Sequence, residues 1–246
     1  MRQTASSITV WLETEVATDA VWEAAYSRFE TPQQEQAKFR ARLTRLGANG
    51  WSRQARIVEL FCGRGGGLHA LAAMGFVNLE GVDLSGNLLA AYQGPARLYQ
   101  GDCRRLGLPD ASRDVVVIHG GLHHLPDFPE GFAAVLPEIA RVLVPGGRLA
   151  FVEPWLTPFL RGVHGLCGRP WLRRAWGKLD ALATMIDGER SVYFPWLEHP
   201  SMVRGLLSRH FETRKCRASF GKLLYVGRKS DTATADRMSF SEKGTG

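Results

Sequence analysis

The sequence predicts an α/β fold built on a doubly wound, mostly parallel sheet, and three observations support this. From Ala55 onward, short apolar runs alternate with helical segments, as in RIVELF, GLHALAAMG, NLEGVDL and SGNLLAAYQ. Such alternation is typical of βαβ units, whose crossovers are almost always right-handed. The first run ends in the glycine-rich turn CGRGGG. Near the other end, ETRKCRAS and FGKLLYVGRK meet around Gly221, too close for a crossover helix, so these two strands should be antiparallel.

Two helices are expected ahead of the glycine turn. Residues 17–29 are amphipathic. The stretch TPQQEQAKFRARLTRLG then offers Thr31 as N-cap, Pro32 at the first helical position, Gln34 at the capping-box position and Gly47 just past the end.

Further strands and helices follow the first βαβ units. ARLYQGD, RDVVVIHG and RLAFVEP read as strands and LPEIARVL as a helix. Asp114 begins a strand, which favours a structural role. Pro145, Gly146 and Gly147 are expected to form a turn into the strand RLAFVEP.

Residues 155–200 interrupt the alternation and hold four of the seven tryptophans, so we expect an inserted helical lid. SMVRGLLSRHF reads as a helix after it, and the polar tail is expected to be disordered. The predicted organisation is an N-terminal helical cover (residues 1–50), a main domain (51–229) that contains the lid, and a tail (230–246).

Composition describes an ordinary globular chain. Its 246 residues are 45% hydrophobic, with no apolar run of bilayer length and no export signal at the start. The four cysteines lie far apart without CxxC spacing, which predicts no zinc site or disulfide framework and favours the cytoplasm. The net charge of +7 comes from scattered cations, with a polyanion or acidic substrate as the alternative near Arg161, Arg169, Arg173, Arg174 and Lys178.

The glycine turn by itself fits two kinds of ligand. Gly63 and Gly65 have the spacing of a dinucleotide fingerprint and Asp83 ends the next strand, but Leu68 stands at the third glycine position. Nucleotide-dependent dehydrogenases and adenosyl-cofactor enzymes share such a turn. No GxxxxGK[ST] sequence occurs, which excludes a P-loop.

Four motifs in order make the resemblance specific. VELFCGRGGG, GVDLSGNLL, GDCRRLGLPDASRDVVVIHGGLHHL and RVLVPGGRLAFVEP resemble those of class I S-adenosylmethionine-dependent methyltransferases, in the small-molecule branch that includes ubiquinone and menaquinone biosynthesis enzymes (methyltransferase type 11 domain). The resemblance implies a Rossmann-like three-layer sandwich with a seven-stranded sheet whose last strand pair is antiparallel. Phe61 departs from the family pattern, which has glycine there.

The resemblance also implies a binding site for S-adenosylmethionine, with S-adenosylhomocysteine as product. Asp83 would accept both ribose hydroxyls, Glu59 would orient the ammonium end, and Asp102 with the Cys103 amide would contact the adenine. The alternatives are a helix N-cap for Asp83, a carboxylate bonded to loop amides for Glu59, and a turn aspartate for Asp102. The expected cofactor-binding set is Glu59, Phe61, Gly63, Gly65, Asp83, Leu84, Asp102, Cys103, His119 and Gly120, the last two mainly through backbone.

Methyl transfer is chiefly a positioning problem that requires no metal, and we predict none. A base helps when the acceptor must lose a proton. The candidate catalytic residues are His123, His124 and Glu153, with Glu189 and His199 of the insertion as further candidate bases. The expected substrate-facing residues are Trp155, His164, Tyr193 and Trp196, which could instead simply bury one another.

The sequence thus predicts a methyltransferase acting on O, C or N of a small organic acceptor that is aromatic or lipid-like. No nucleic-acid module is recognisable. The alternatives are an RNA or protein methyltransferase, supported only by the net charge, and a noncatalytic protein that keeps the fold as a scaffold. The oligomeric state is not predicted.

Overall fold

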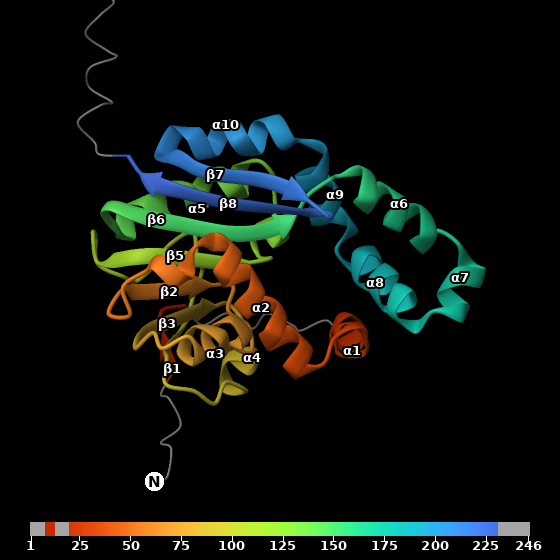
Figure 1. Ribbon diagram of the computed structural model, residues 1–246, viewed down its shortest axis with the longest axis horizontal. Coiled ribbons are helices and arrows are strands. Elements are labelled where there is room, and N and C mark those ends of the chain that lie inside the picture. Colours follow the sequence, from red (N-terminus) through yellow and green to blue (C-terminus); the bar gives the residue numbers. More distant parts are fainter. Residues whose placement is uncertain (1–7, 13–19, 231–246) are drawn as a thin grey trace, which may run out of the picture.

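The computed structural model describes residues 8–12 and 20–230 and shows a mixed sheet between helical layers (Figure 1). The strands are β1 (Ile8–Val10), β2 (Arg56–Leu60), β3 (Asn78–Asp83), β4 (Arg97–Gln100), β5 (Arg113–His119), β6 (Leu143–Pro154), β7 (Phe211–Ser219) and β8 (Lys222–Lys229). The helices are α1 (Ala20–Phe29), α2 (Pro32–Leu46), α3 (Gly66–Ala73), α4 (Gly86–Ala90), α5 (Glu130–Val142), α6 (Pro158–Cys167), α7 (Pro170–Ala175), α8 (Gly177–Gly188), α9 (Arg190–Glu198) and α10 (Pro200–His210), with 3-10 turns η1 (Ala48–Gly50) and η2 (Leu122–His124).

The sheet has the predicted mixed topology but one strand more than predicted. Its order is β1-β4-β3-β2-β5-β6-β8-β7, with β8 antiparallel to both neighbours and the other pairs parallel. The prediction of seven strands was wrong because β1 adds an eighth at the edge beside β4. A three-residue strand carries no readable periodicity. It is anchored by Trp11, which stacks on Tyr99 at 4.4 Å between ring centroids.

Both faces of the sheet are buried, as parallel strands require. Val58 and Ile118 belong to the core on the side of α5 and α10, whereas their neighbours Ile57 and Val117 belong to the core under α2 and α3. Successive side chains of a strand point to opposite faces, so short runs of apolar residues fill both cores.

The second helix begins and ends as its sequence predicts. Thr31 and Gln34 form a reciprocal capping box, Pro32 takes the first turn, and Gly47 ends α2 with φ 92°. One predicted turn differs: Pro145 to Gly147 lie inside β6, where the pairing with β5 shifts register between Arg113 and Val115. An irregularity within a strand takes the place of the separate turn.

The first helix packs on the inserted helices, which we call the lid (α6 to α9). Ala25 of α1 is buried against Ala181 and Met185 of α8, and Figure 1 shows α1 beside α8 at one end of the sheet. Residues 17–19 of the predicted first helix, residues 231–246 of the predicted disordered tail and the first seven residues of the chain lie outside the described part. Among the described residues, no helix is long and apolar enough to cross a membrane.

Gly47→Ala is expected to destabilise the protein by about 1 kcal/mol, because alanine must adopt the left-handed conformation at the end of α2. Gly50→Ala is the matched control. A Cβ at either glycine meets no atom within 4 Å, but only Gly47 has a positive φ. Urea unfolding measures both free energies. Equal losses in the two variants would contradict the assignment of the cost to backbone conformation.

Candidate active site

The carboxyl ends of β2, β3, β5 and β6 meet at the edge of the sheet that faces α1 and the lid (Figure 1). We call this edge the carboxyl edge. Open α/β sheets bind ligands in the crevice outside such strand ends. Most of the site residues predicted from the sequence lie on the loops that leave this edge.

The glycine turn after β2 is held in left-handed backbone. Phe61, Gly63 and Gly65 have φ values of 56°, 50° and 76°. Phe61 pays a cost of about 1–2 kcal/mol that glycine would avoid, which accounts for the glycine usual at this place. Its ring is accommodated by Gly121, where a Cβ would lie 2.2 Å from the Phe61 Cγ.

Glu59 lies on β2 beneath this turn and is 2% exposed. The Leu68 amide donates to its carboxylate, and a Cβ on Gly67 would lie 2.0 Å from its Oε1. Its Oε2 has no hydrogen-bond partner among the described residues. Burial raises the pKa of Glu59 well above its usual range, with the charges of Glu35 and Asp83 acting in the same direction. A buried acceptor of this kind suits a cationic ligand group.

Asp83 ties the end of β3 to the glycine turn. Its Oδ2 accepts from the Gly63 amide at 2.8 Å and its Oδ1 from the Ser85 amide at 2.9 Å. Burial raises the pKa of Asp83, while these amide bonds oppose the rise. The N-cap of α4 is Ser85, so Asp83 does not serve as the cap. The neighbouring Leu84 carbonyl accepts from Gln100 Nε2 at 3.3 Å.

Asp102 and Cys103 follow β4, with their side chains already engaged. Arg104 binds the Asp102 carboxylate at 2.6 Å. Burial favours the neutral acid, but the hydrogen bonds and charge of Arg104 hold the pKa of Asp102 below its usual value. The Cys103 thiol is buried in the core, and burial raises its pKa. The Asp102 carboxylate, which was expected to contact a ligand, is paired with Arg104 here. Only the backbone of this loop is then left for such a contact.

His119 ends β5 with a ring that sequence reasoning did not use. The imidazole stacks on Phe39 of α2 at 4.8 Å, and neither ring nitrogen has a hydrogen-bond partner among the described residues. Burial, with the charges of Arg42 and Lys38, lowers the pKa of His119 to about 3, so the ring is neutral. The next residue, Gly120, has φ 84° and open space beside it.

Glu153, at the end of β6, is fully buried and organises the loop after β5. Its Oε1 accepts from the Gly121 and Leu122 amides at 2.8 Å each, and its Oε2 contacts His123 Nδ1 at 2.7 Å. Burial favours protonation, but His123 and the two amides hold the pKa of Glu153 below its usual value. Both oxygens of Glu153 are occupied by protein groups, and the catalytic role predicted for this carboxylate stays a prediction.

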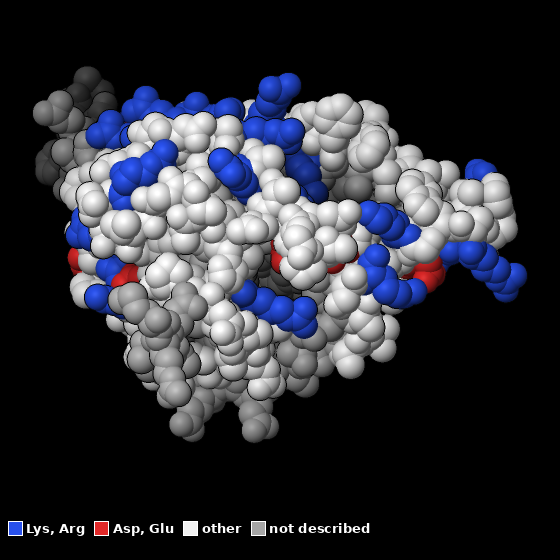
Figure 2. Space-filling model, turned by 60° about the horizontal axis from the view of Figure 1, so that its bottom comes forward, with Lys and Arg blue, Asp and Glu red and all other residues white. Residues whose placement is uncertain are grey.

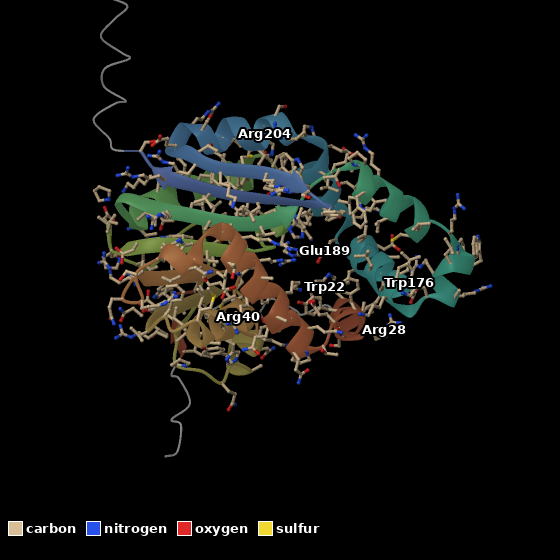
Figure 3. All side chains as sticks on the ribbon, viewed as in Figure 1. Trp22, Arg28, Arg40, Trp176, Glu189 and Arg204 are labelled. Carbon is tan, nitrogen blue, oxygen red and sulfur yellow. The ribbon has the colours of Figure 1, made fainter. Side chains whose placement is uncertain are left out.

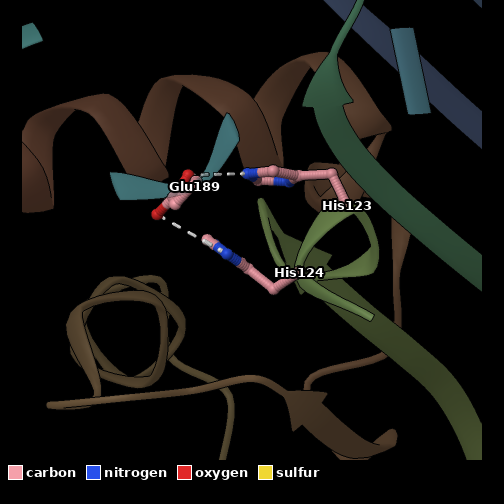
Figure 4. A group of neighbouring side chains, drawn as sticks. All are labelled: His123, His124 and Glu189. Atoms are coloured by element: carbon pink, nitrogen blue, oxygen red, sulfur yellow. Dashed lines mark ion pairs between the residues drawn. The ribbon is translucent and has the colours of Figure 1, made fainter. Parts of the chain in front are cut away.

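His123 and His124 converge on Glu189, at the junction of α8 and α9 (Figure 4). Glu189 Oε2 lies 3.6 Å from His123 Nε2, and its Oε1 lies 3.5 Å from His124 Nδ1. Burial opposes protonation of His123, yet the charges of Glu153 and Glu189 raise its pKa above the ordinary value. Burial, together with His123, lowers the pKa of His124 to about 4.

This cluster lines a cleft between the sheet and the lid. Glu189 and Trp22 lie in the gap between the carboxyl edge and α1 in Figure 3, and the space-filling view shows a hollow there with charged side chains at its rim (Figure 2). Lys222, at the start of β8, keeps exposed surface, yet burial and the charge of Arg42 lower its pKa to about 8.

The charged face of α2 is the part of the site that sequence reasoning missed. Glu35, Lys38, Phe39 and Arg42 follow the spacing that places side chains on one side of a helix. A Cβ on Gly66 would lie 2.7 Å from the Phe39 ring and 3.1 Å from the Glu35 carboxyl, so this face covers the glycine turn. The sequence did contain a signal for this face: in the predicted helix, Phe39 stands among charged residues and not in an apolar stripe.

Two of the expected substrate-facing residues belong to the core. Trp196 is fully buried, and its Nε1 donates to the Pro154 carbonyl at 2.8 Å. Trp155 is 4% exposed and lies edge-on to Trp196, 6.3 Å away. Their rings fasten α9 to the end of β6, so the expectation of an acceptor-facing role is corrected by their burial.

The other two lie on the lid side of the histidine cluster. The Tyr193 ring stands edge-on to His123 at 5.9 Å, and its hydroxyl lies 3.2 Å from His164 Nε2. Tyr193 therefore reaches the cluster, whereas His164 stands behind it. His164 also lines a cavity of about 670 Å³ between the lid helices and Arg28 of α1.

The comparisons with known proteins agree with this geometry. Residues 58–151 match a family model described as methyltransferase domain. A Pyrococcus horikoshii protein superposes with a TM-score of 0.63 at 16% identity over 85% of this chain and 98% of that one. An S-adenosylmethionine-dependent methyltransferase from Mesorhizobium loti gives 0.54 at 18%, over 76% and 96%. Residues 58–151 therefore resemble a methyltransferase domain, and the superpositions show that the chain shares the α/β Rossmann-like fold of these structures.

Curated relatives place the resemblance among quinone methyltransferases. A demethylmenaquinone methyltransferase from Deinococcus radiodurans is 31% identical over 155 residues, which span 60% of this chain and 61% of the relative, less than two thirds of its length. A demethylmenaquinone methyltransferase from Listeria monocytogenes is 26% identical over 165 residues, 56% of this chain and 68% of that protein.

His119→Phe is expected to stabilise the protein at acid pH. The folded pKa of about 3 lies below the unfolded value of about 6.5, so the unfolded chain binds a proton that the folded chain does not, and stability falls as the pH drops below 6.5. Phenylalanine removes this loss, a relative gain of about 1 kcal/mol between pH 7.5 and 5.5. Urea unfolding of both proteins at the two pH values measures it. If the difference in unfolding free energy between the two proteins does not change with pH, the assignment of a neutral, buried His119 ring is contradicted.

Proposed function

We propose that the protein transfers a methyl group from S-adenosylmethionine to a small aromatic acceptor of the hydroquinone type. The observation that carries this is the arrangement at the carboxyl edge, where the glycine turn with Glu59 and Asp83 adjoins the histidine cluster beneath the lid. The names of the Deinococcus and Listeria relatives support a quinone-like acceptor.

The residues present fit this cofactor. A Cβ at Gly63 or Gly120 would meet no atom closer than 3.9 Å, so both backbones stand open to a ligand. Glu59 and His119 hold buried polar atoms without partners among the described residues. In this proposal Glu59 receives the ammonium end and the Asp83 carboxylate, which keeps lone pairs beyond its two amide bonds, accepts the ribose hydroxyls.

The loops after β3 and β4 complete the proposed binding site. The backbone of Leu84 and the amide of Cys103 would border the adenine, since the Asp102 carboxylate is paired with Arg104. The turn residues Phe61 and Gly65 hold the backbone in shape. When bound, S-adenosylmethionine would supply an electrophilic methyl group to the acceptor and would be released as S-adenosylhomocysteine.

We assign proton removal from the acceptor to His123. Glu153 contacts Nδ1, which turns Nε2 toward the cleft, and a buried carboxylate behind a histidine raises its basicity. The 3.6 Å between Nε2 and Glu189 is longer than a hydrogen bond, so an acceptor hydroxyl can compete for that nitrogen. Glu189 and the neutral His124 would hold the acceptor oxygen in place, and Tyr193 would border its ring.

Asp83→Asn is expected to weaken binding of S-adenosylhomocysteine by about tenfold or more, because the ribose loses a charged acceptor. Calorimetry with the full chain measures the dissociation constant. Asp114→Asn is the matched control. Asp114 lies near the start of β5 and pairs with Arg56, the first residue of β2. Equal weakening in both variants would reject the ribose assignment, and no binding by the native protein would reject the cofactor.

The rate of methylation, kcat/KM, should rise with pH through the raised pKa of His123, because only neutral Nε2 takes a proton. Glu153→Gln removes the charge that raises this pKa, so the acid limb should move to lower pH and kcat should fall by about tenfold or more. A soluble naphthohydroquinone serves as acceptor. Binding of S-adenosylhomocysteine should stay within about twofold, which separates this effect from loss of the fold. An unmoved acid limb would contradict the assignment.

A further inference from the structure

The first two lid helices present a surface that the described part of the protein does not cover. No side chain of α6 or α7 is as fully buried as the side chains of the core. Figure 1 shows both helices beyond the end of the sheet, with α6 following β6 and α7 farthest out. Leu160 and Cys167 of α6 pack partly against the core, whereas α5 and α10 have fully buried apolar residues.

Large apolar side chains are exposed along this projection. On α6, Phe159 and Leu166 are 55% and 39% exposed and stand seven residues apart, hence on the same side of the helix. At α7, Trp171 and Trp176 are 63% and 57% exposed. Phe220, on the β7–β8 turn, is 78% exposed and contacts Phe159 at 5.8 Å, so the apolar surface continues onto the sheet.

The same helices carry positive charge and no acid. Residues 155–178 contain five Lys and Arg and neither Asp nor Glu. Arg173 pairs with Asp180 and Asp187 of α8, but four of the cations make no ion pair with any described residue: Arg161, Arg169, Arg174 and Lys178. The space-filling view shows basic side chains around this lobe (Figure 2).

We propose that the outer surface of α6 and α7 docks on an anionic lipid bilayer. Exposed tryptophans beside unpaired cations are the combination that enters the headgroup region, where indole rings find both apolar and polar contacts and Lys and Arg meet lipid phosphates. A second copy of the chain would bring like charges together across a two-fold axis. A nucleic acid would engage the cations but leave Leu166 and Phe159 uncovered.

Docking in this manner turns the cleft toward the bilayer. The lid runs directly from α7 into α8 and α9, and this part of the lid carries Glu189 and Tyr193. The cavity that His164 lines is also lined by Arg174, one of the unpaired cations, and by Asp180 and Asp187, which pair with Arg173. An acceptor dissolved in the membrane would then approach the cleft without crossing water. The proposal rests on the surface alone and does not require the methyl-transfer assignment.

Co-sedimentation with vesicles tests this. The full chain should bind phosphatidylcholine vesicles that contain phosphatidylglycerol at least about tenfold more tightly than phosphatidylcholine alone, and added salt should weaken that binding. Vesicle binding is read without cofactor or acceptor, so its outcome is separate from that of the methyl-transfer experiments. No binding to anionic vesicles, or equal binding to both kinds, would overturn the proposal.

Two pairs of variants locate the surface. Trp171→Ser with Trp176→Ser should lose about tenfold in vesicle affinity, whereas Val77→Ser with Met202→Ser, exposed apolar positions elsewhere, should not. The double variant Arg161→Glu with Arg174→Glu should lose at least about tenfold in vesicle affinity. The control double variant, Arg40→Glu on α2 with Arg217→Glu on β7, makes the same change in net charge. Its vesicle affinity should stay within about threefold of that of the native protein. Circular dichroism checks that each variant folds.

The controls also separate a polyanion from a bilayer. Equal losses in test and control variants would show that net charge alone drives binding, which contradicts a defined docking face. Binding of duplex RNA that depends on Arg161 and Arg174 but not on the two tryptophans, without vesicle binding, would reassign the surface to nucleic acid.

Discussion

The site depends on the buried carboxylate of Glu153. A charge placed in the core is costly unless it is fully bonded, and Glu153 meets this condition with two amides of the loop after β5 and with His123. These bonds join the end of β6 to the adjacent loop. They fix the backbone beside Gly120 and set the orientation of His123 together. The end of β6 and the loop after β5 are therefore parts of one hydrogen-bonded unit.

The glycine turn is the second constraint, and helix α2 completes it. Left-handed backbone at Phe61, Gly63 and Gly65 turns the chain sharply after β2, and the two glycines place no side chain in the turn. Phe39 and Glu35 of α2 cover the turn, and burial together with the charges of Arg42 and Lys38 lowers the pKa of His119. A helix that lies before the methyltransferase domain match thus sets the electrostatics of the site.

Much of the architecture was readable from particular residues. The capping box at Thr31, the alternating apolar runs and the close strand pair around Gly221 are local signals, and the structure confirms the elements that they predict. The edge strand β1 was missed because pairing with β4, not its own sequence, makes it a strand. The lid tryptophans could not be sorted from sequence, because Trp155 and Trp196 become core residues only through contacts with distant segments, while Trp171 and Trp176 stay exposed.

By itself, the sequence determined the α/β class, the order of its elements and the turn after β2, because backbone propensity, glycine placement and apolar periodicity act over a few residues. Tertiary structure alone decided the pairing of Asp102 with Arg104, the burial of Glu153 behind His123 and the approach of Glu189 from the lid. Charge and protonation depend on which groups from distant segments come within a few ångströms and on how much water they lose. Neither quantity is encoded in the spacing of residues along the chain.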